Sequence, residues 1–225
     1  MVNLNVVEKL VLCILDKEKS SRFLFFDGSY IASIGASAFM ELFLEDAISL
    51  NDEKKVVIKS ELNTDKDYLK EVYKEIQDSK PKKLKKWLET YGAGFSTQSA
   101  KNILNGAVES LEKQGVLNVT REQGIFKEKV RYAASEEIVN SIKNEIRKQF
   151  LEDGTLTKEC VSLTALINGC ELLKKDLSRD EKKIISKKLK EMKKNGTVEG
   201  IKELQSVVDE IQAVMMAAIT ASSVH

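Results

Sequence analysis

Apolar residues recur every three or four positions along most of this chain, which is the spacing of a helix that buries one face. Near the end of the chain, for example, Leu204, Val207, Val208 and Ile211 fall on one side of such a helix. The pattern predicts an all-α fold with one or two small β-hairpins. The predicted helices are Leu4–Asp16, Ser33–Glu45, Lys66–Asp78, Pro81–Tyr91, Thr97–Gln114, Glu136–Asp153, Thr157–Lys175, Ser178–Lys194 and Val198–Thr220.

Several helix starts carry capping signals. Ser178 is followed three residues later by Glu181, which is a capping box, and Thr157 and Ser135 are suitable N-caps. The single proline, Pro81, suits the first position of its helix. No linker of biased composition divides the chain, so residues 1–225 are predicted to form one domain. Its central helices are predicted to be Val161–Leu173 and Val207–Ile219.

Two segments depart from the helical pattern and predict hairpins. The first is Ala47–Ile58, with its turn at Asn51-Asp52. The second, residues 115–132, follows a helix that Gly115 is suited to end, because glycine tolerates the left-handed C-cap. Ile125 and Phe126 fall near the turn of this hairpin, where they are hard to bury locally. We therefore expect the hairpin to bind a partner's tail or a second copy of the chain.

Composition narrows the class of partner. Lys and Arg number 36 against 35 Asp and Glu, so the net charge is +1 and any anionic partner must meet a local basic patch. The N-terminus has no basic region of a signal peptide, and the longest apolar run, Ala213–Ile219, is far shorter than the ~20 residues of a membrane span. The chain is predicted to be cytoplasmic.

The residue inventory favours binding over catalysis. The single histidine is His225, the last residue, and the three cysteines form no CxxC pair. We expect these cysteines to be small buried residues in a reducing compartment. Neighbouring acids such as Asp209 and Glu210 diverge on a helix. No metal site, cofactor or enzymatic activity is predicted.

A basic segment, 80–91, has two interpretations. Its apolar residues, among them Trp87 and Tyr91, fall on one helix face. In one interpretation the tryptophan lies at a membrane interface and the lysines contact anionic lipid. In the other, Trp87 is buried in the core and the lysines are solvated. The flanking lysines are Lys80, Lys82, Lys83, Lys85 and Lys86.

The order of these segments resembles the Golgi phosphoprotein 3 family over nearly the whole chain, from Asn3 to about Ser222. The segments that carry the resemblance include LNVVEKLVLCILD near the start, SIGASAFMELFLEDAISL, SKPKKLKKWLETY, VESLEKQGVLNV and VDEIQAVMMAAITAS near the end. Each motif is mainly an apolar pattern, but their order and spacing together are specific.

The resemblance implies a mostly helical domain with a protruding hairpin. Eukaryotic members bind phosphatidylinositol 4-phosphate on the cytosolic face of the Golgi and hold the cytosolic tails of membrane enzymes. Their lipid site uses a tryptophan and three arginines, which align here with Phe26, Gly35, Lys101 and Leu104. Phe26 and Lys101 keep an aromatic face and a positive charge, whereas Gly35 and Leu104 supply no donor. These departures predict a distant, for example prokaryotic, member with weak or altered lipid selectivity.

A second function remains open. A helix ending in LEKQGVL before a hairpin also resembles the recognition helix and wing of winged helix-turn-helix DNA-binding proteins. The predicted helix carries Lys101 and Lys113 against Glu109 and Glu112, whereas a groove-binding helix needs a basic face. Nucleic acid is therefore the less favoured partner, and an anionic phospholipid surface is the favoured one, contacted by Phe26, Lys101, Lys82, Lys83, Lys85 and Lys86.

Overall fold

A computed structural model describes residues 2–17, 28–93, 98–123, 128–152, 154–170, 172, 176–195 and 207–213. Within these ranges the chain is mainly helical and has two small antiparallel sheets, as the sequence predicts. The helices are α1 (Val6–Lys17), α3 (Gly28–Leu44), α4 (Asp67–Asp78), α5 (Leu84–Leu88), a π-helical turn η1 (Glu89–Ala93), α6 (Gln98–Lys113), α7 (Glu136–Leu151), α8 (Lys158–Gly169) and α9 (Arg179–Asn195). Residues 207–213 are also helical.

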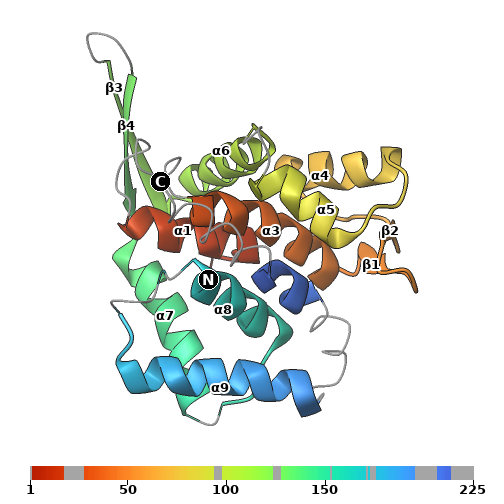
Figure 1. Ribbon diagram of the computed structural model, residues 1–225. Coiled ribbons are helices and arrows are strands. Elements are labelled where there is room, and N and C mark those ends of the chain that lie inside the picture. Colours follow the sequence, from red (N-terminus) through yellow and green to blue (C-terminus); the bar gives the residue numbers. More distant parts are fainter. Residues whose placement is uncertain are drawn as a thin grey trace.

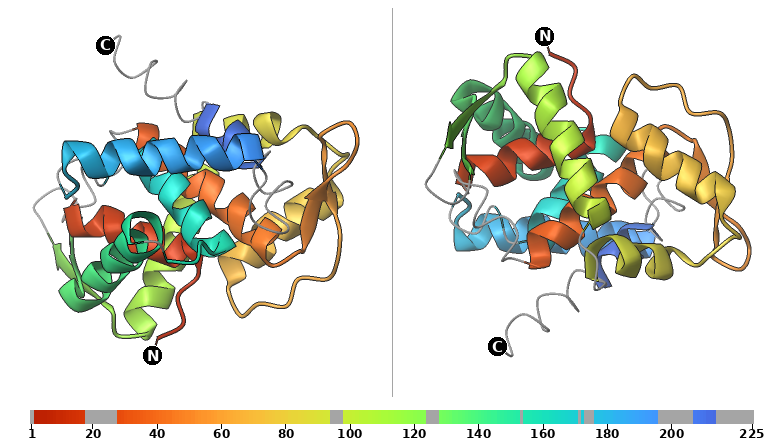
Figure 2. Two further views of the ribbon diagram at one scale, coloured as in Figure 1. Left: turned by 90° about the horizontal axis from the view of Figure 1, so that it is seen from below. Right: turned by 90° about the horizontal axis from the view of Figure 1, so that it is seen from above.

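Helices α1 and α3 occupy the middle of the molecule, with α6 on one side and α8 on the other (Figure 1). Helix α9 lies across the far side of α7, and α4 and α5 flank the opposite end of α3. The same arrangement is visible from below and from above in Figure 2. The two hairpins therefore lie at opposite ends of the molecule, β1–β2 beside α4 and β3–β4 beyond α1 and α6.

Helix α3 is buried on almost every side, from Ser29 to Leu42. Its sequence is rich in glycine, alanine and serine, and these small residues allow neighbouring elements to approach closely. Gly35 gives the clearest case, because a Cβ atom there would lie 2.8 Å from the carbonyl oxygen of Tyr91 in η1. The aromatic ring of Phe39, one turn later, packs edge-on against Tyr91 at 5.1 Å between ring centroids. Helix α3 is thus fixed against η1 by a glycine contact and an aromatic contact.

The predicted capping residues are confirmed. The Ser178 hydroxyl accepts a hydrogen bond from the Glu181 N–H, and the Glu181 carboxylate accepts one from the Ser178 N–H. Ser135 and Thr157 cap α7 and α8. Gly115 has a φ of 71°, and the N–H of Val116 donates to the Leu111 carbonyl at 3.1 Å, which completes a Schellman turn after α6.

The prediction that Pro81 opens a helix is wrong. Helix α5 begins at Leu84 with Lys83 as N-cap, so the predicted Pro81–Tyr91 helix starts three residues too early. The reason is a tertiary contact, since the N–H of Val56 donates to the Lys82 carbonyl at 2.9 Å and Lys55 forms a β-bridge with Lys83. Residues 82 and 83 are therefore held in extended conformation along β2. Helix α3 also differs from prediction, because it begins at Gly28 rather than Ser33.

Both predicted hairpins are present. Strands β1 (Ile48–Leu50) and β2 (Val56–Ile58) are joined by a turn in which the Asn51 carboxamide oxygen accepts from the N–H groups of Glu53 and Lys55. Strands β3 (Leu117–Gln123) and β4 (Glu128–Ala134) pair from Leu117 with Ala134 to Gln123 with Glu128. The second hairpin is the longer one, and it projects from the body of the molecule (Figure 1).

The predicted central segments are buried where they are described. Helix α8 is buried from Cys160 to Ile167, and Val207, Val208 and Ile211 are also buried. The later parts of both predicted segments, up to Leu173 and Ile219, lie outside or mostly outside the described residues. The three cysteines, Cys13, Cys160 and Cys170, are free and buried as expected. Burial raises the pKa of the Cys13 thiol to about 12, so this thiol is unreactive at neutral pH.

Candidate functional site: a basic surface and a projecting hairpin

A surface rich in lysine forms where the β1–β2 turn meets the start of α5. The β-bridge between Lys55 and Lys83 brings together two segments that lie 28 residues apart in the sequence. We call the resulting patch the basic surface. Its members are Lys54, Lys55, Lys82, Lys83, Lys85 and Lys86.

Some of these lysines are already paired. Lys55 forms an ion pair with Glu53, and Lys86 lies 3.6 Å from the Glu89 carboxylate. The hydrogen bond from Lys55 holds the pKa of the Glu53 carboxyl below its usual value. Among the described residues no ion pair involves Lys54, Lys82, Lys83 or Lys85, and all four are exposed.

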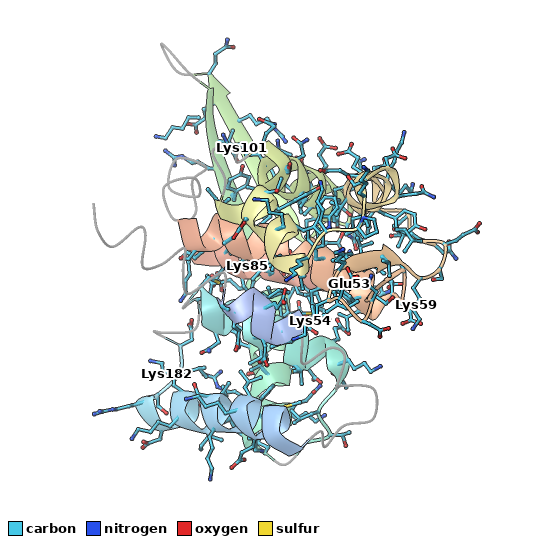
Figure 3. The ribbon with its side chains drawn as sticks, turned by 45° about the vertical axis from the view of Figure 1, so that its right-hand side comes forward. Glu53, Lys54, Lys59, Lys85, Lys101 and Lys182 are labelled. Atoms are coloured by element: carbon cyan, nitrogen blue, oxygen red, sulfur yellow. The ribbon has the colours of Figure 1, made fainter. Side chains whose placement is uncertain are left out.

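Figure 3 shows the geometry of this region. Lys54 and Lys59 project from the β1–β2 hairpin, and Lys85 projects from α5. Lys59 is held by Asp46 at 2.7 Å, so its charge is locally compensated. The carboxylate of Glu210, from the helical segment 207–213, accepts the backbone N–H of Lys85 at 3.1 Å. The basic surface therefore combines a backbone held by these contacts with mostly exposed lysine side chains.

The tryptophan of this segment lies in the core. Trp87 is 1% exposed and packs against Phe39 and Tyr91. The Lys82 ammonium lies 4.4 Å from the centroid of its ring, within the range of a cation–π contact. The interpretation with an interfacial tryptophan is wrong, because the side chain has no surface to offer a membrane. The buried residues of α5 and η1, among them Trp87 and Tyr91, instead anchor the segment that carries the lysines.

Of the positions that the resemblance aligns with the family's lipid site, two that are described, Gly35 and Leu104, have no phosphate donor. Leu104 is 2% exposed in the core. Gly35 faces the backbone of Tyr91 so closely that no side chain fits. Lys101 is half-buried at the start of α6 and already has an interaction within the protein. Phe26 lies outside the described residues. Lys101 is also on a different element from the lysines of α5 (Figure 3).

The base of the β3–β4 hairpin is part of the core and its outer half is exposed. Leu117 is buried, and Val119 and Tyr132 are half-buried against the core. Further out, Arg121 makes a two-pronged ion pair with Glu112 of α6, at 3.2 and 3.3 Å. This pair links the hairpin to α6 at the surface of the molecule. Ile125 and Phe126, the predicted interaction residues, lie outside the described residues.

Sequence reasoning missed the contribution of Lys54 and Lys55 to the basic surface. The hairpin that carries them was predicted, and so were the lysines after Pro81. The contact between them depends on a pairing distant in sequence, for which the local pattern carries no signal. The exposed positions of α6 include Asn102, Asn105, Glu109 and Lys113, so this helix has no basic stripe of the kind that a DNA groove requires.

No helix in the described ranges is both long and apolar enough to span a bilayer.

Comparison with known proteins bears on the family of this chain. A search of curated proteins finds no match. The family model of Golgi phosphoprotein 3 (GPP34) matches residues 6–214, which is most of the 225-residue chain. The match extends from α1, through the β3–β4 hairpin, to just beyond the segment 207–213. The chain belongs to the Golgi phosphoprotein 3 (GPP34) family.

Proposed function

We propose that this protein is a peripheral membrane adaptor that contacts anionic phospholipid through the basic surface and uses the β3–β4 hairpin to dock a partner's tail or a second copy. In this proposal the protein acts by binding and not by catalysis, at the cytoplasmic face of a membrane. Family membership supports the general role. The observation that carries the lipid contact is the cluster of exposed lysines joined by the bridge between Lys55 and Lys83.

The positions of the two surfaces suit an adaptor. The basic surface lies at the β1–β2 end of the molecule and the β3–β4 hairpin lies at the other end (Figures 1 and 2). A protein docked on the hairpin would therefore leave the lysines of α5 accessible. The two binding events could occur on the same molecule without competition for surface.

The binding free energy expected from these lysines predicts weak lipid binding of low selectivity. Each basic residue near an anionic leaflet contributes about 1 kcal/mol. The four lysines without an ion pair among the described residues would then contribute about 4 kcal/mol, which corresponds to a dissociation constant of about 1 mM. Gly35 and Leu104 offer no guanidinium to select a phosphoinositide headgroup. Stable recruitment would need a second contact, such as a partner held by the hairpin or self-association.

Liposome co-sedimentation across a salt series tests this proposal. We expect similar binding to phosphatidylserine vesicles and to phosphatidylinositol 4-phosphate vesicles of matched surface charge. Binding should decrease steeply as salt rises to physiological strength, where the Debye length is about 8 Å. Reversing two exposed charges with Lys83→Glu and Lys85→Glu should abolish binding, because half of the contributing charges become repulsive. Folding should be unaffected, since neither lysine has an ion-pair partner among the described residues.

A matched charge reversal on the far side of the molecule provides the control. Lys148→Glu in α7 and Lys190→Glu in α9 change the same number of charges at exposed positions, and neither lysine has an ion-pair partner among the described residues. This variant should sediment like the wild type if the basic surface is the contact. Equal loss in both variants would mean that net charge alone governs binding. Selective sedimentation with phosphatidylinositol 4-phosphate would overturn the predicted lack of selectivity.

A further inference from the structure

A polar pocket lies at the N-terminal end of α1. Its volume is about 670 Å³, within the range of small-molecule sites. Its wall includes Glu41 and Glu45 from α3, Lys66 from the loop before α4, Ser110 from α6 and Glu159 from α8. Four helices and a loop thus converge on one cavity that the proposed membrane function does not use.

Glu41 is the unusual residue of this pocket. It is 6% exposed, yet it lines the cavity. One oxygen, Oε2, accepts the backbone N–H of Val6 at 2.8 Å. The other, Oε1, has no hydrogen-bond partner in the described part of the chain, so this buried carboxylate keeps one acceptor available to the pocket. Oε1 is not among the buried atoms that lack a partner, so it is open to the cavity, where a ligand's N–H group can replace water as its donor.

A second buried carboxylate, Glu8, is fully satisfied and therefore not available. It forms an ion pair with Lys66 at 3.0 Å, and it accepts hydrogen bonds from Ser110, Gln114 and the N–H of Asn5. Lys66 is thus already neutralised by Glu8. The contrast with Glu41 separates a structural carboxylate from one that still lacks a donor.

The remaining charges favour a cation. Lys9 neutralises Glu159 in an ion pair. The exposed Asp65 lies 3.7 Å from the same Lys66. After these pairs are removed, two lining carboxylates, Glu41 and Glu45, remain against one lining ammonium, Lys113. An anion would also find the first N–H groups of α1 occupied, because Val6 donates to Glu41 and Glu8 donates to the Asn5 side chain at 2.9 Å. The pocket therefore complements a positively charged donor.

We infer that this pocket binds a primary ammonium group, whose N–H donors hydrogen-bond Glu41 and whose charge is balanced by Glu41 and Glu45. The ammonium belongs either to a free diamine or to a lysine side chain of a peptide, since both present the same donor. Burial raises the pKa of the free Glu41 carboxyl to about 7, with smaller contributions from Glu45, Glu159 and Glu8. A bound cation stabilises the ionised form, so binding releases protons near neutral pH.

Isothermal titration calorimetry of the full-length protein tests this site. The probes are 1,5-diaminopentane and the peptide acetyl-Ala-Lys-Ala-amide. Their neutral counterparts are 1,5-pentanediol and the same peptide with an acetylated lysine. We expect at least one cationic probe to bind and neither neutral counterpart to do so. At pH 7 the measured heat should differ between two buffers of unlike ionisation enthalpy, because protons are released. The probe that binds identifies the source of the ammonium.

Glu41→Gln isolates the charge without removing the Val6 contact, because the amide oxygen still accepts the Val6 N–H. This variant should bind at least tenfold more weakly, since a charge-assisted hydrogen bond is lost. Its Tm reports that it remains folded. Glu137→Gln, an exposed change on α7 with no role in this pocket, should bind like the wild type. Undetectable binding of both cationic probes at 10 mM, or unchanged affinity in Glu41→Gln, would overturn the inference.

Discussion

Gly35 sets the distance between α3 and η1. Its missing side chain allows the Tyr91 carbonyl to approach to 2.8 Å from where a Cβ atom would lie. Leu104 is likewise enclosed by the core. At both positions the surrounding atoms leave little space for a long side chain with a phosphate donor.

Gly35→Ala should therefore destabilise the protein. The added methyl group would have to displace backbone atoms of Tyr91, and overpacking of this kind costs about 1 to 3 kcal/mol. For a chain of this length, each kcal/mol lowers Tm by about 2–4 °C. Gly28→Ala is the matched control, because a Cβ atom there meets nothing within 4 Å. Thermal unfolding followed by circular dichroism compares the two variants, and equal Tm values would contradict this account of Gly35.

At the scale of elements, the sequence predicted the helices whose apolar residues recur at regular spacing. The apolar stripes of α1, α4, α6, α7 and α9 predicted the ends of these helices to within about two residues. The start of α5 was missed, because the bridge between Lys55 and Lys83 holds the preceding residues extended. The burial of Glu8 and Glu41 was not predicted from the sequence, because charged residues are usually exposed. Their partners come from α6, from the loop before α4 and from the start of α1, so no local pattern could reveal the pocket.

The β3–β4 hairpin should be separable from folding in its outer half. Deleting 121–128 and replacing Lys129-Val130 by Asn-Gly joins Thr120 to Arg131, its partner in the ladder, through a two-residue turn. The core contacts of Leu117, Val119 and Tyr132 remain. The exposed Arg121–Glu112 pair is lost at a cost of about 1 kcal/mol or less. We expect a Tm within about 4 °C of the wild type.

The same deletion should abolish self-association or partner capture, measured by size-exclusion chromatography with light scattering and by pull-down of the partner's tail. Ile125→Ser with Phe126→Ser provides a variant of unchanged length. It should behave like the deletion if the apolar residues predicted at the turn make the contact. Unfolding of the deletion variant would instead make the hairpin a core element and contradict its role as an interaction surface.

Over the whole molecule, charged residues are distributed unevenly. The net charge is +1, yet the basic surface and the pocket at α1 have opposite local charges. The composition could predict only that an anionic partner must bind a local basic patch. The exposed ion pairs, such as Lys183 with Asp180, contribute little to stability. The buried Glu41 has a larger effect, because its protonation is linked to folding.

Glu41 gives the whole protein a distinctive pH dependence. Its pKa is about 7 in the folded state against 4.5 for the free side chain, so between these values the folded state binds more protons than the unfolded state. The contribution of Glu41 therefore favours folding at low pH and decreases as pH rises from about 4.5 to 7, by about 3 kcal/mol in total at 1.36 kcal/mol per pKa unit.

Glu41→Gln has no titrating group at this position, and it should be more stable than the wild type at pH 8 but not at pH 5. Chemical denaturation of both proteins at the two pH values measures the difference. A gap in unfolding free energy that stays constant between pH 5 and pH 8 would show that Glu41 is ionised throughout. Saturation with 1,5-diaminopentane should narrow the gap at pH 8, because the bound ammonium stabilises the ionised carboxylate of the wild type alone.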